Sequence, residues 1–326
     1  MSIPFVTLRE ARHGEAVPVA PLIRRLVANN PSKFTYLGTG TYLVGDERAL
    51  AVIDPGPLDD AHRDALAKAI GGVAVKAILV THCHADHSPL AAWLAAETGA
   101  PTVGFGPHPR LDDPDADADA DADPDVDSGP DPDHMTEGEV VKIEETTDHD
   151  FDPVIRVVDG DVAAVGHGWT LRAVHTPGHT SNHMCFSLDE ESALFTGDHI
   201  MGWSTTVIGP PDGDMRAYLD SLRKVQGRAD GVFWPTHGAP VTETRPFLEA
   251  FLAHRLDREA QVVAAVRGGE TSIPAMVRVL YAGVRDELHK PAGRSVLAHL
   301  IKLVDDGVVA TDDGARPTLK AVYRPV

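Results

Sequence analysis

The sequence predicts an α/β fold with two β-sheets between outer helices, followed by a small α+β domain. Apolar strand-like segments alternate with helical segments in two similar halves, one on each side of an acidic stretch. From about residue 246 the pattern changes to three helical segments and a short hairpin, the outline of a winged-helix module. A chain of 326 residues is long enough for one large domain and one smaller domain.

The first half begins with two predicted strands in residues 41–54, around a turn at Gly45-Asp46. A helix is expected over 59–70, because Gly71-Gly72 follows it. Residues 74–82 then predict a buried strand, residues 89–96 a helix, and residues 101–105 another strand. For the second helix we expect Ser88 as N-cap and Pro89 at the first position.

The second half contains strand patterns at 169–175, 183–188 and 192–198, a helix at 216–225, and a strand leading into a loop at 231–238. Helical spacing of apolar residues then covers 246–266, 273–284 and 294–307. A hairpin is predicted from 308–310 and 319–323. We therefore expect a catalytic domain at residues 1–250 and a winged-helix-like domain at residues 251–326.

The net charge of −20 is concentrated in one segment. Between residues 112 and 161 there are 20 acidic residues and two basic ones, whereas the rest of the chain has 29 acidic and 27 basic residues. Residues 112–133 alternate Asp with Ala and contain several prolines. This composition predicts a solvated, flexible insertion over about residues 112–150, because it has no apolar anchors and repels itself.

The composition also indicates in which cellular compartment the protein is expected. No run approaches the roughly 20 apolar residues that a membrane span needs. The N-terminus lacks a basic stretch followed by an apolar one, so we expect no signal peptide. Cys83 and Cys185 are the only cysteines, which excludes a disulfide framework and favours a cytoplasmic protein.

Metal-ligating residue types gather where the predicted strands end. The sequence THCHADH at 81–87 places three histidines and an aspartate in one loop, more ligands than one ion needs from a single loop. Three further turns contain His179 and His183, Asp198 and His199, and His237. Two divalent ions about 3.5 Å apart would bind a shared water and lower its pKa. Asp198, arriving alone on its strand, is the best candidate to bridge them.

The order H-x-H-x-D-H, then an isolated His, an Asp and a final His, resembles the metallo-β-lactamase superfamily over roughly residues 30–250. The resemblance implies a four-layer αββα sandwich and a centre for two divalent metal ions, with zinc as the default and iron or manganese as alternatives in one position. Asp86 and Asp198 would be the catalytic carboxylates. The implied ligands are His82, His84 and His179 for one ion, Asp86, His87 and His237 for the other, and Asp198 between them. Asp54 in VIDPG, with Thr81 and His183, would orient these ligands from behind.

A narrower resemblance concerns one branch of this superfamily. GTGTYLVG, TPGHTSNHMCF, TGDHIMGWSTTV and AHRLDREAQVVAAV are similar to bacterial hydrolases and to the mitochondrial lactamase-like endoribonuclease, which share a winged-helix tail. The Asp-Ala insertion departs from that branch, and Ser88-Pro89 stands where relatives commonly have a glycine pair. His199, His254 and Arg255 are candidate substrate contacts. The pair His254-Arg255 would equally serve to anchor the tail to the main domain.

The reaction class that follows is hydrolysis by a metal-bridging hydroxide of a small carbonyl substrate such as a thioester, ester or lactone. The alternative is cleavage of single-stranded RNA. Binding RNA requires a row of Lys and Arg side chains around the cleft, and the sequence alone does not show such side chains converging. A β-lactamase is disfavoured by Asp198, and a persulfide dioxygenase or a DNA-binding metal or ligand sensor stays less favoured. No membrane partner is expected. A homodimer is one alternative for the assembly of the chain, because winged-helix modules often serve in packing or dimerisation.

Overall fold

The computed structural model describes residues 3–115, 146–282 and 289–326. The αββα sandwich is confirmed, with two mixed sheets and a C-terminal winged-helix region. Most of the predicted acidic insertion, residues 116–145, lies outside the described residues.

The first sheet has seven strands in the order β1-β2-β3-β4-β5-β6-β7. Their bounds are β1 Val17–Ala20, β2 Ile23–Val27, β3 Gly40–Gly45, β4 Ala49–Ile53, β5 Ala74–Leu79, β6 Thr102–Gly104 and β7 Ile155–Arg156. Strands β1 to β4 pair antiparallel, and β4 to β7 pair parallel. Strands β4 and β5 therefore end at the same edge of the sheet.

The second sheet has five strands in the order β12-β11-β10-β9-β8. Their bounds are β8 Val162–Gly166, β9 Trp169–His175, β10 Met184–Leu188, β11 Ala193–Gly197 and β12 Val232–Pro235. Strands β11 and β12 pair parallel, so the residues that follow them also meet at one edge. The sequence patterns predicted β9 to β12 closely but gave no indication of β1, β2, β7 or β8.

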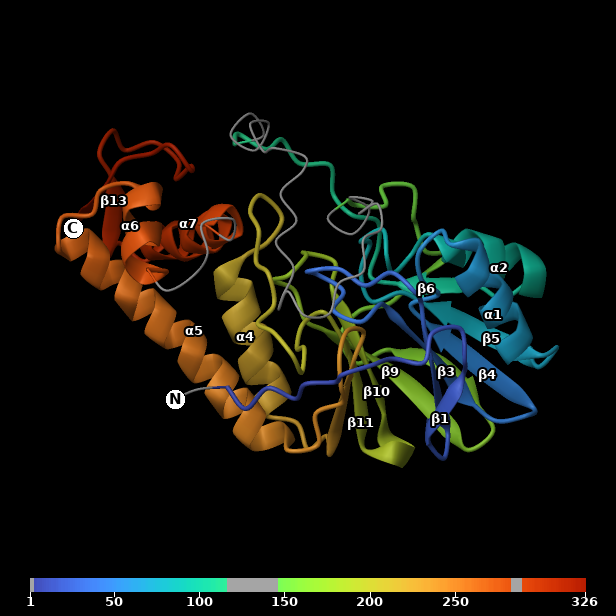
Figure 1. Cartoon of the computed structure of the whole chain (residues 1–326). Coiled ribbons are helices and arrows are strands. Elements are labelled where there is room, and N and C mark those ends of the chain that lie inside the picture. The colour runs from blue at the N-terminus through green and yellow to red at the C-terminus, as the bar shows by residue number, and fades with distance from the viewer. Residues whose placement is uncertain (1–2, 116–145, 283–288) are drawn as a thin grey trace.

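Helices cover the outer faces of both sheets (Figure 1). Helices α1 Asp60–Ile70 and α2 Leu90–Thr98 pack on the first sheet, and α4 Met215–Gln226 and α5 Thr244–Arg267 pack on the second. The two sheets bury a shared core that includes Tyr42, Trp169 and Phe186. Each sheet therefore has two buried faces, and its central strands are buried at every position.

Local signals fix the helix ends. Asp59 caps α1 by accepting a hydrogen bond from the His62 amide, and Gly71 ends the helix in the left-handed conformation at φ 60°. The cap predicted for the second helix was wrong. Pro89 is the N-cap of α2, and the Ser88 hydroxyl instead donates to Asp148 Oδ2 at 2.6 Å.

The C-terminal region consists of the end of α5, α6 Ile273–Leu280, α7 His289–Asp305, β13 Val309–Thr311 and β14 Tyr323–Pro325. The second hairpin strand lies at 323–325, not at the predicted 319–323. The predicted domain boundary at residue 250 falls inside α5. The first part of this helix packs on α4 through Phe247 and Phe251, and its last turns pack on α6 and α7 through Val262 and Val266.

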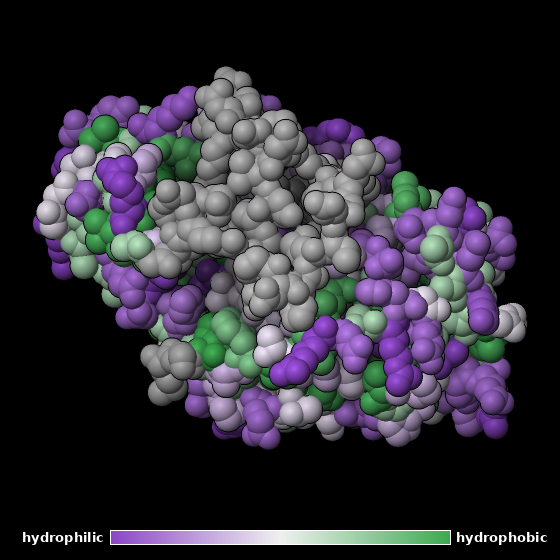
Figure 2. All heavy atoms as spheres, viewed as in Figure 1, coloured by the Kyte–Doolittle hydropathy of each residue, from purple (hydrophilic) through white to green (hydrophobic). Residues whose placement is uncertain are grey.

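Hydrophilic side chains cover most of the coloured surface in Figure 2, with apolar ones scattered between them. Among the described residues, no helix is both long enough and apolar enough to cross a membrane.

Candidate metal centre

The loops that follow β5, β9, β11 and β12 bring their histidines and aspartates together between the two sheets. Three overlapping groups of metal-ligating atoms form there, and within each group these atoms lie within 4.8 Å of one another. Two of them share no residue: the first group is His82, His84 and His179, and the second group is Asp86, His87 and His237. The third set, His82, His87 and Asp198, overlaps both. All seven residues named as ligands from the sequence are therefore brought to one place.

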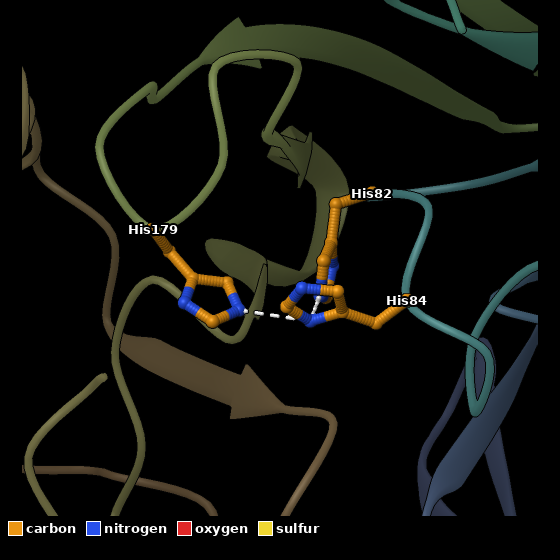
Figure 3. A group of neighbouring side chains, drawn as sticks. All are labelled: His82, His84 and His179. Atoms are coloured by element: carbon orange, nitrogen blue, oxygen red, sulfur yellow. Dashed lines mark hydrogen bonds between the residues drawn. The ribbon is translucent and has the colours of Figure 1, made fainter. Parts of the chain in front are cut away.

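The first group is drawn in Figure 3. His82 and His84 come from the loop after β5, and His179 faces them from the loop between β9 and β10. His84 Nδ1 lies 2.9 Å from His82 Nε2 and 3.2 Å from His179 Nε2. These separations are close to the roughly 3.3 Å that nitrogens about 2.0–2.1 Å from one tetrahedral zinc ion would have.

The partners behind these rings determine which nitrogens carry lone pairs. Thr81 Oγ1 donates to Asp54 Oδ2, so it accepts from His82 Nδ1, 3.1 Å away. His179 Nδ1 donates to the carbonyl oxygen of Val207 at 2.6 Å. The Nε2 atoms of both histidines are therefore lone-pair acceptors, and a single proton on His84 Nδ1 can satisfy only one of them. A cation would satisfy all three nitrogens, so the donor set fits a metal ion.

The second group is made of Asp86, His87 and His237. Asp86 Oδ2 lies 3.3 Å from His87 Nε2 and 3.2 Å from His237 Nε2. His87 Nδ1 donates to Asp54 Oδ2 at 2.9 Å, which leaves His87 Nε2 buried with no hydrogen-bond partner. A buried ring nitrogen without a hydrogen-bond partner beside a carboxylate also fits a metal ion.

Asp198 lies between the two groups. Its Oδ1 is 3.7 Å from His87 Nε2 and 3.5 Å from His237 Nε2, whereas its Oδ2 is 3.9 Å from His179 Nε2. Oδ1 is buried and has no hydrogen-bond donor among the described residues. One oxygen thus faces each group, the arrangement expected of a bridging carboxylate.

Asp54 holds this arrangement from behind. Its carboxylate accepts hydrogen bonds from the amide and hydroxyl of Thr81, both at 2.8 Å, from His87 Nδ1, and from Thr236 Oγ1 at 3.1 Å. Asp54 is 1% exposed and sits at φ 50°, directly after β4. One buried carboxylate therefore orients residues on two loops, the one after β5 and the one after β12.

The two groups differ in their electrostatics. Burial lowers the pKa of His82, His84 and His179, that of His84 to about 3, so these histidines are neutral. Burial also acts on His87 and His237, but the carboxylates of Asp86 and Asp198 outweigh it. They raise the pKa of His87 well above its ordinary value and that of His237 to about 9.

The affinity of the second group for zinc should therefore rise with pH. At pH 7 both His87 and His237 carry an additional proton in the metal-free protein that an ion must displace, and for His237 this competition disappears only above about pH 9. We expect the zinc dissociation constant of this group to fall about tenfold per pH unit for each displaced proton between pH 6 and 8. The first group, already neutral, should change little. Zinc titration against a chromophoric chelator at three pH values measures both constants, and an equal pH dependence of the two would contradict this assignment.

Thr39 supports Asp86 and was not expected from the sequence. Its hydroxyl donates to Asp86 Oδ2 at 2.8 Å, and the residue is fully buried just before β3. We expect Thr39→Val to weaken zinc binding by the second group about tenfold. The matched control is Thr41→Val in the same segment, because the Thr41 hydroxyl contacts His62 instead. Equal zinc affinities in the two variants would show that Thr39 does not orient Asp86.

Residues 146–148, which follow the acidic segment, pair with the loop after β5. The amide of Ala85 donates to the carbonyl of Thr146 at 2.9 Å, and that of Asp148 donates to the carbonyl of Cys83 at 2.7 Å. With the Ser88–Asp148 contact, these bonds hold the histidine loop from outside. Ser88 thus ties this loop to a carboxylate 60 positions away in the chain.

The remaining predicted residues lie behind or outside the group. His183 accepts from the amide of Asp198 at 3.2 Å and contacts Thr176 through Nδ1. His199 is fully buried, and its ring packs on Tyr218 at 5.1 Å between centroids. Cys83 is buried and faces away from the ligands, with its sulfur 3.0 Å from Asn182 Nδ2.

His254 and Arg255 lie on α5 and are not among the clustered ligands. Arg255 is 4% exposed and donates a hydrogen bond to the carbonyl of Thr206. Its guanidinium lies over the ring of Tyr218, 5.3 Å from the centroid. Of the two readings that the sequence left level, this geometry fits the anchoring one.

Two known domain families match the chain. Residues 36–237 match the metallo-beta-lactamase superfamily, and residues 272–316 match the beta-lactamase associated winged helix domain. A β-lactamase domain protein from Burkholderia ambifaria has the same fold, with a TM-score of 0.72 and 22% identity over 100% of this chain and 97% of that one.

Two curated relatives carry a more specific description. The atrochrysone carboxyl ACP thioesterase of Aspergillus chevalieri is 30% identical over 90% of this chain and 84% of that protein. The atrochrysone carboxyl ACP thioesterase nsrC of Aspergillus novofumigatus is 30% identical over 94% of this chain and 87% of its own length. These descriptions do not support the endoribonuclease branch expected from the sequence. The chain belongs to the metallo-β-lactamase superfamily, as a metal-dependent hydrolase whose catalytic domain is followed by the associated winged-helix domain.

Proposed function

We propose that this chain hydrolyses an acyl thioester with two metal ions, most simply zinc. The observation that carries the substrate class is the similarity to thioesterases over about nine-tenths of the chain. The observation that carries the chemistry is the buried set of seven ligands described above. His82, His84 and His179 would hold one ion, and Asp86, His87 and His237 the other, with Asp198 reaching both.

The chain's own residues do the positioning. Divalent ions held there would supply a nucleophilic water at neutral pH and polarise the thioester carbonyl. Asp198 would keep the two groups in register, because each of its oxygens faces one group. Asp54 fixes the tautomer of His87, so that its Nε2 lone pair points inward.

A hollow beside the loop that carries His179 supports a carbonyl substrate over RNA. It has a volume of about 370 Å³ and is lined partly by Pro109, Leu111, Pro177, Pro211, Asp212 and Asp214. Among the described residues that line it there is no Lys or Arg, whereas a site for a polyanion needs them. We place the acyl group of the substrate in this hollow, against its prolines and Leu111.

The test is release of free thiol from acyl thioesters of N-acetylcysteamine, followed with a thiol reagent. Zinc-loaded protein should release thiol, chelation should stop the release, and added zinc should restore it. His82→Ala serves as the control for contaminating hydrolases. Labelled single-stranded RNA is incubated in parallel. Cleavage of RNA by the parent alone, with no thiol released, would contradict the thioesterase proposal and favour the endoribonuclease alternative.

A further inference from the structure

We propose that Arg255 is a positioning residue for the metal centre, through which α5 holds the loop between β11 and α4 against the ligand His179. This inference rests on the proposed function, because it takes His179 as a metal ligand. It assigns to the C-terminal helices a part in building the centre, in addition to packing on the catalytic domain.

The loop between β11 and α4 touches the proposed centre at two points. The carbonyl oxygen of Val207 accepts the hydrogen bond from His179 Nδ1, which sets the ring's orientation and leaves Nε2 free for a metal. The neighbouring Thr206 places its hydroxyl 2.8 Å from the carbonyl oxygen of Asp198. A shift of this loop would therefore move or release both His179 and the backbone of Asp198.

Arg255 is the contact that ties this loop to α5. Its Nη2 donates to the carbonyl of Thr206, next to the residue that orients His179. Its guanidinium also packs over Tyr218, whose hydroxyl donates to the carbonyl of His199 at 2.9 Å. The same side chain thus supports the loop directly and supports the segment after Asp198 through one intermediate.

The burial of Arg255 indicates that its hydrogen bond to the Thr206 carbonyl is functionally required. Among the described residues no carboxylate lies within ion-pair distance of its guanidinium, and its buried Nε has no hydrogen-bond partner. A buried charge without a carboxylate is costly, and an apolar side chain would pack there at lower cost. Fixing the Thr206 carbonyl is the interaction that an apolar residue could not provide.

A second arginine of the C-terminal region reaches the same loop. Arg294 Nη1 donates to the carbonyl of Pro210 at 2.7 Å. Two residues later, Asp212 Oδ2 accepts from the amide of Ser181 at 2.8 Å, close to His179 in the chain. The loop is therefore held by α5 and α7 on one side and bears on the His179 segment on the other.

The test compares metal binding, not turnover. The parent protein is first titrated with zinc and with cobalt(II), whose absorption spectrum reports ligand geometry. Arg255→Met should weaken about tenfold the binding of the ion held by His82, His84 and His179 and change the cobalt spectrum, with a smaller effect on the ion held by Asp86, His87 and His237. Arg255→Lys, which keeps the charge and a donor, should recover part of this loss. If Arg255→Met does not fold, Arg255→Lys tests the proposal instead, and its metal affinity is expected to be several-fold lower than that of the parent.

Two matched variants separate positioning from general loosening. Arg258 lies on the same helix, donates to the carbonyl of Leu280 at 3.1 Å and packs over Tyr281, all within the C-terminal region. Arg216 on α4 forms an ion pair with Asp306 on the C-terminal side of α7, at 2.6 Å. Arg258→Met and Arg216→Met should both bind the two ions as the parent does.

The proposal is overturned if Arg255→Met keeps both affinities and the cobalt spectrum of the parent, or if all three variants lose affinity alike. A parent protein that binds no metal would contradict the proposed function instead, and this is seen before any variant is compared.

Discussion

Replacing Asp198 with alanine is expected to lower kcat/KM for thioester hydrolysis by about a thousandfold or more. The reason is that its two oxygens face the two ligand groups separately, so removing the carboxylate breaks the connection between them. The fold should survive, because His87 and His237 keep the Asp86 carboxylate as a partner when that of Asp198 is lost. Steady-state kinetics on the zinc-loaded variant measure the effect, and circular dichroism checks the fold.

Asp115 offers a control for this experiment. It is also a buried carboxylate, 3% exposed, but its oxygens accept from the amide of Leu319 in the C-terminal region. Asp115→Ala should leave kcat/KM within about twofold of the parent once folded. An Asp198→Ala protein that retained most of its activity would rule out a bridging role for this carboxylate.

Replacing Asp54 with alanine should cause the largest loss of stability among the residues around the centre. Four donors from Thr81, His87 and Thr236 meet on this one carboxylate, and all of them are buried. Each donor left unsatisfied costs about 1–3 kcal/mol before relaxation, so we expect the free energy of unfolding to fall by about 3–5 kcal/mol. Urea unfolding of the chelated protein measures this value without a contribution from bound metal.

The backbone angle at Asp54 allows two substitutions, alanine and asparagine, to be compared. At φ 50° alanine is strained, whereas asparagine tolerates this region and keeps one acceptor oxygen. Asp54→Asn should therefore be clearly more stable than Asp54→Ala. Asp59→Ala, which removes only the cap of α1, should cost about 1 kcal/mol. A cost for Asp54→Ala no larger than that of Asp59→Ala would contradict the role of Asp54 as the common acceptor.

The gathering of the ligands could be predicted from sequence for a physical reason. Histidine and aspartate are costly to bury, so their repeated occurrence directly after apolar strands indicates a shared polar site. His82, Asp198 and His237 each follow such a strand, and the parallel pairs β4–β5 and β11–β12 bring their ends to common edges. The resemblance to a known superfamily then supplied which residues would share an ion.

Three of the supporting residues, Thr39, Thr236 and Arg25, could not be found in this way. Thr39 and Thr236 are ordinary polar residues whose role depends on contacts 47 and 182 positions away in the chain. Arg25 was missed for the same reason, although its guanidinium donates to the carbonyl of Gly238, next to His237, at 2.6 Å. Its strand β2 contains two successive arginines, which hides the alternation that marks a strand.

Anomalous scattering from crystals of the zinc-loaded protein tests the central claim most directly. We predict two zinc peaks, one among His82, His84 and His179 and the other among Asp86, His87 and His237, with Asp198 in contact with both. A single peak, or a second peak away from these residues, would contradict a two-metal centre built by this set of ligands.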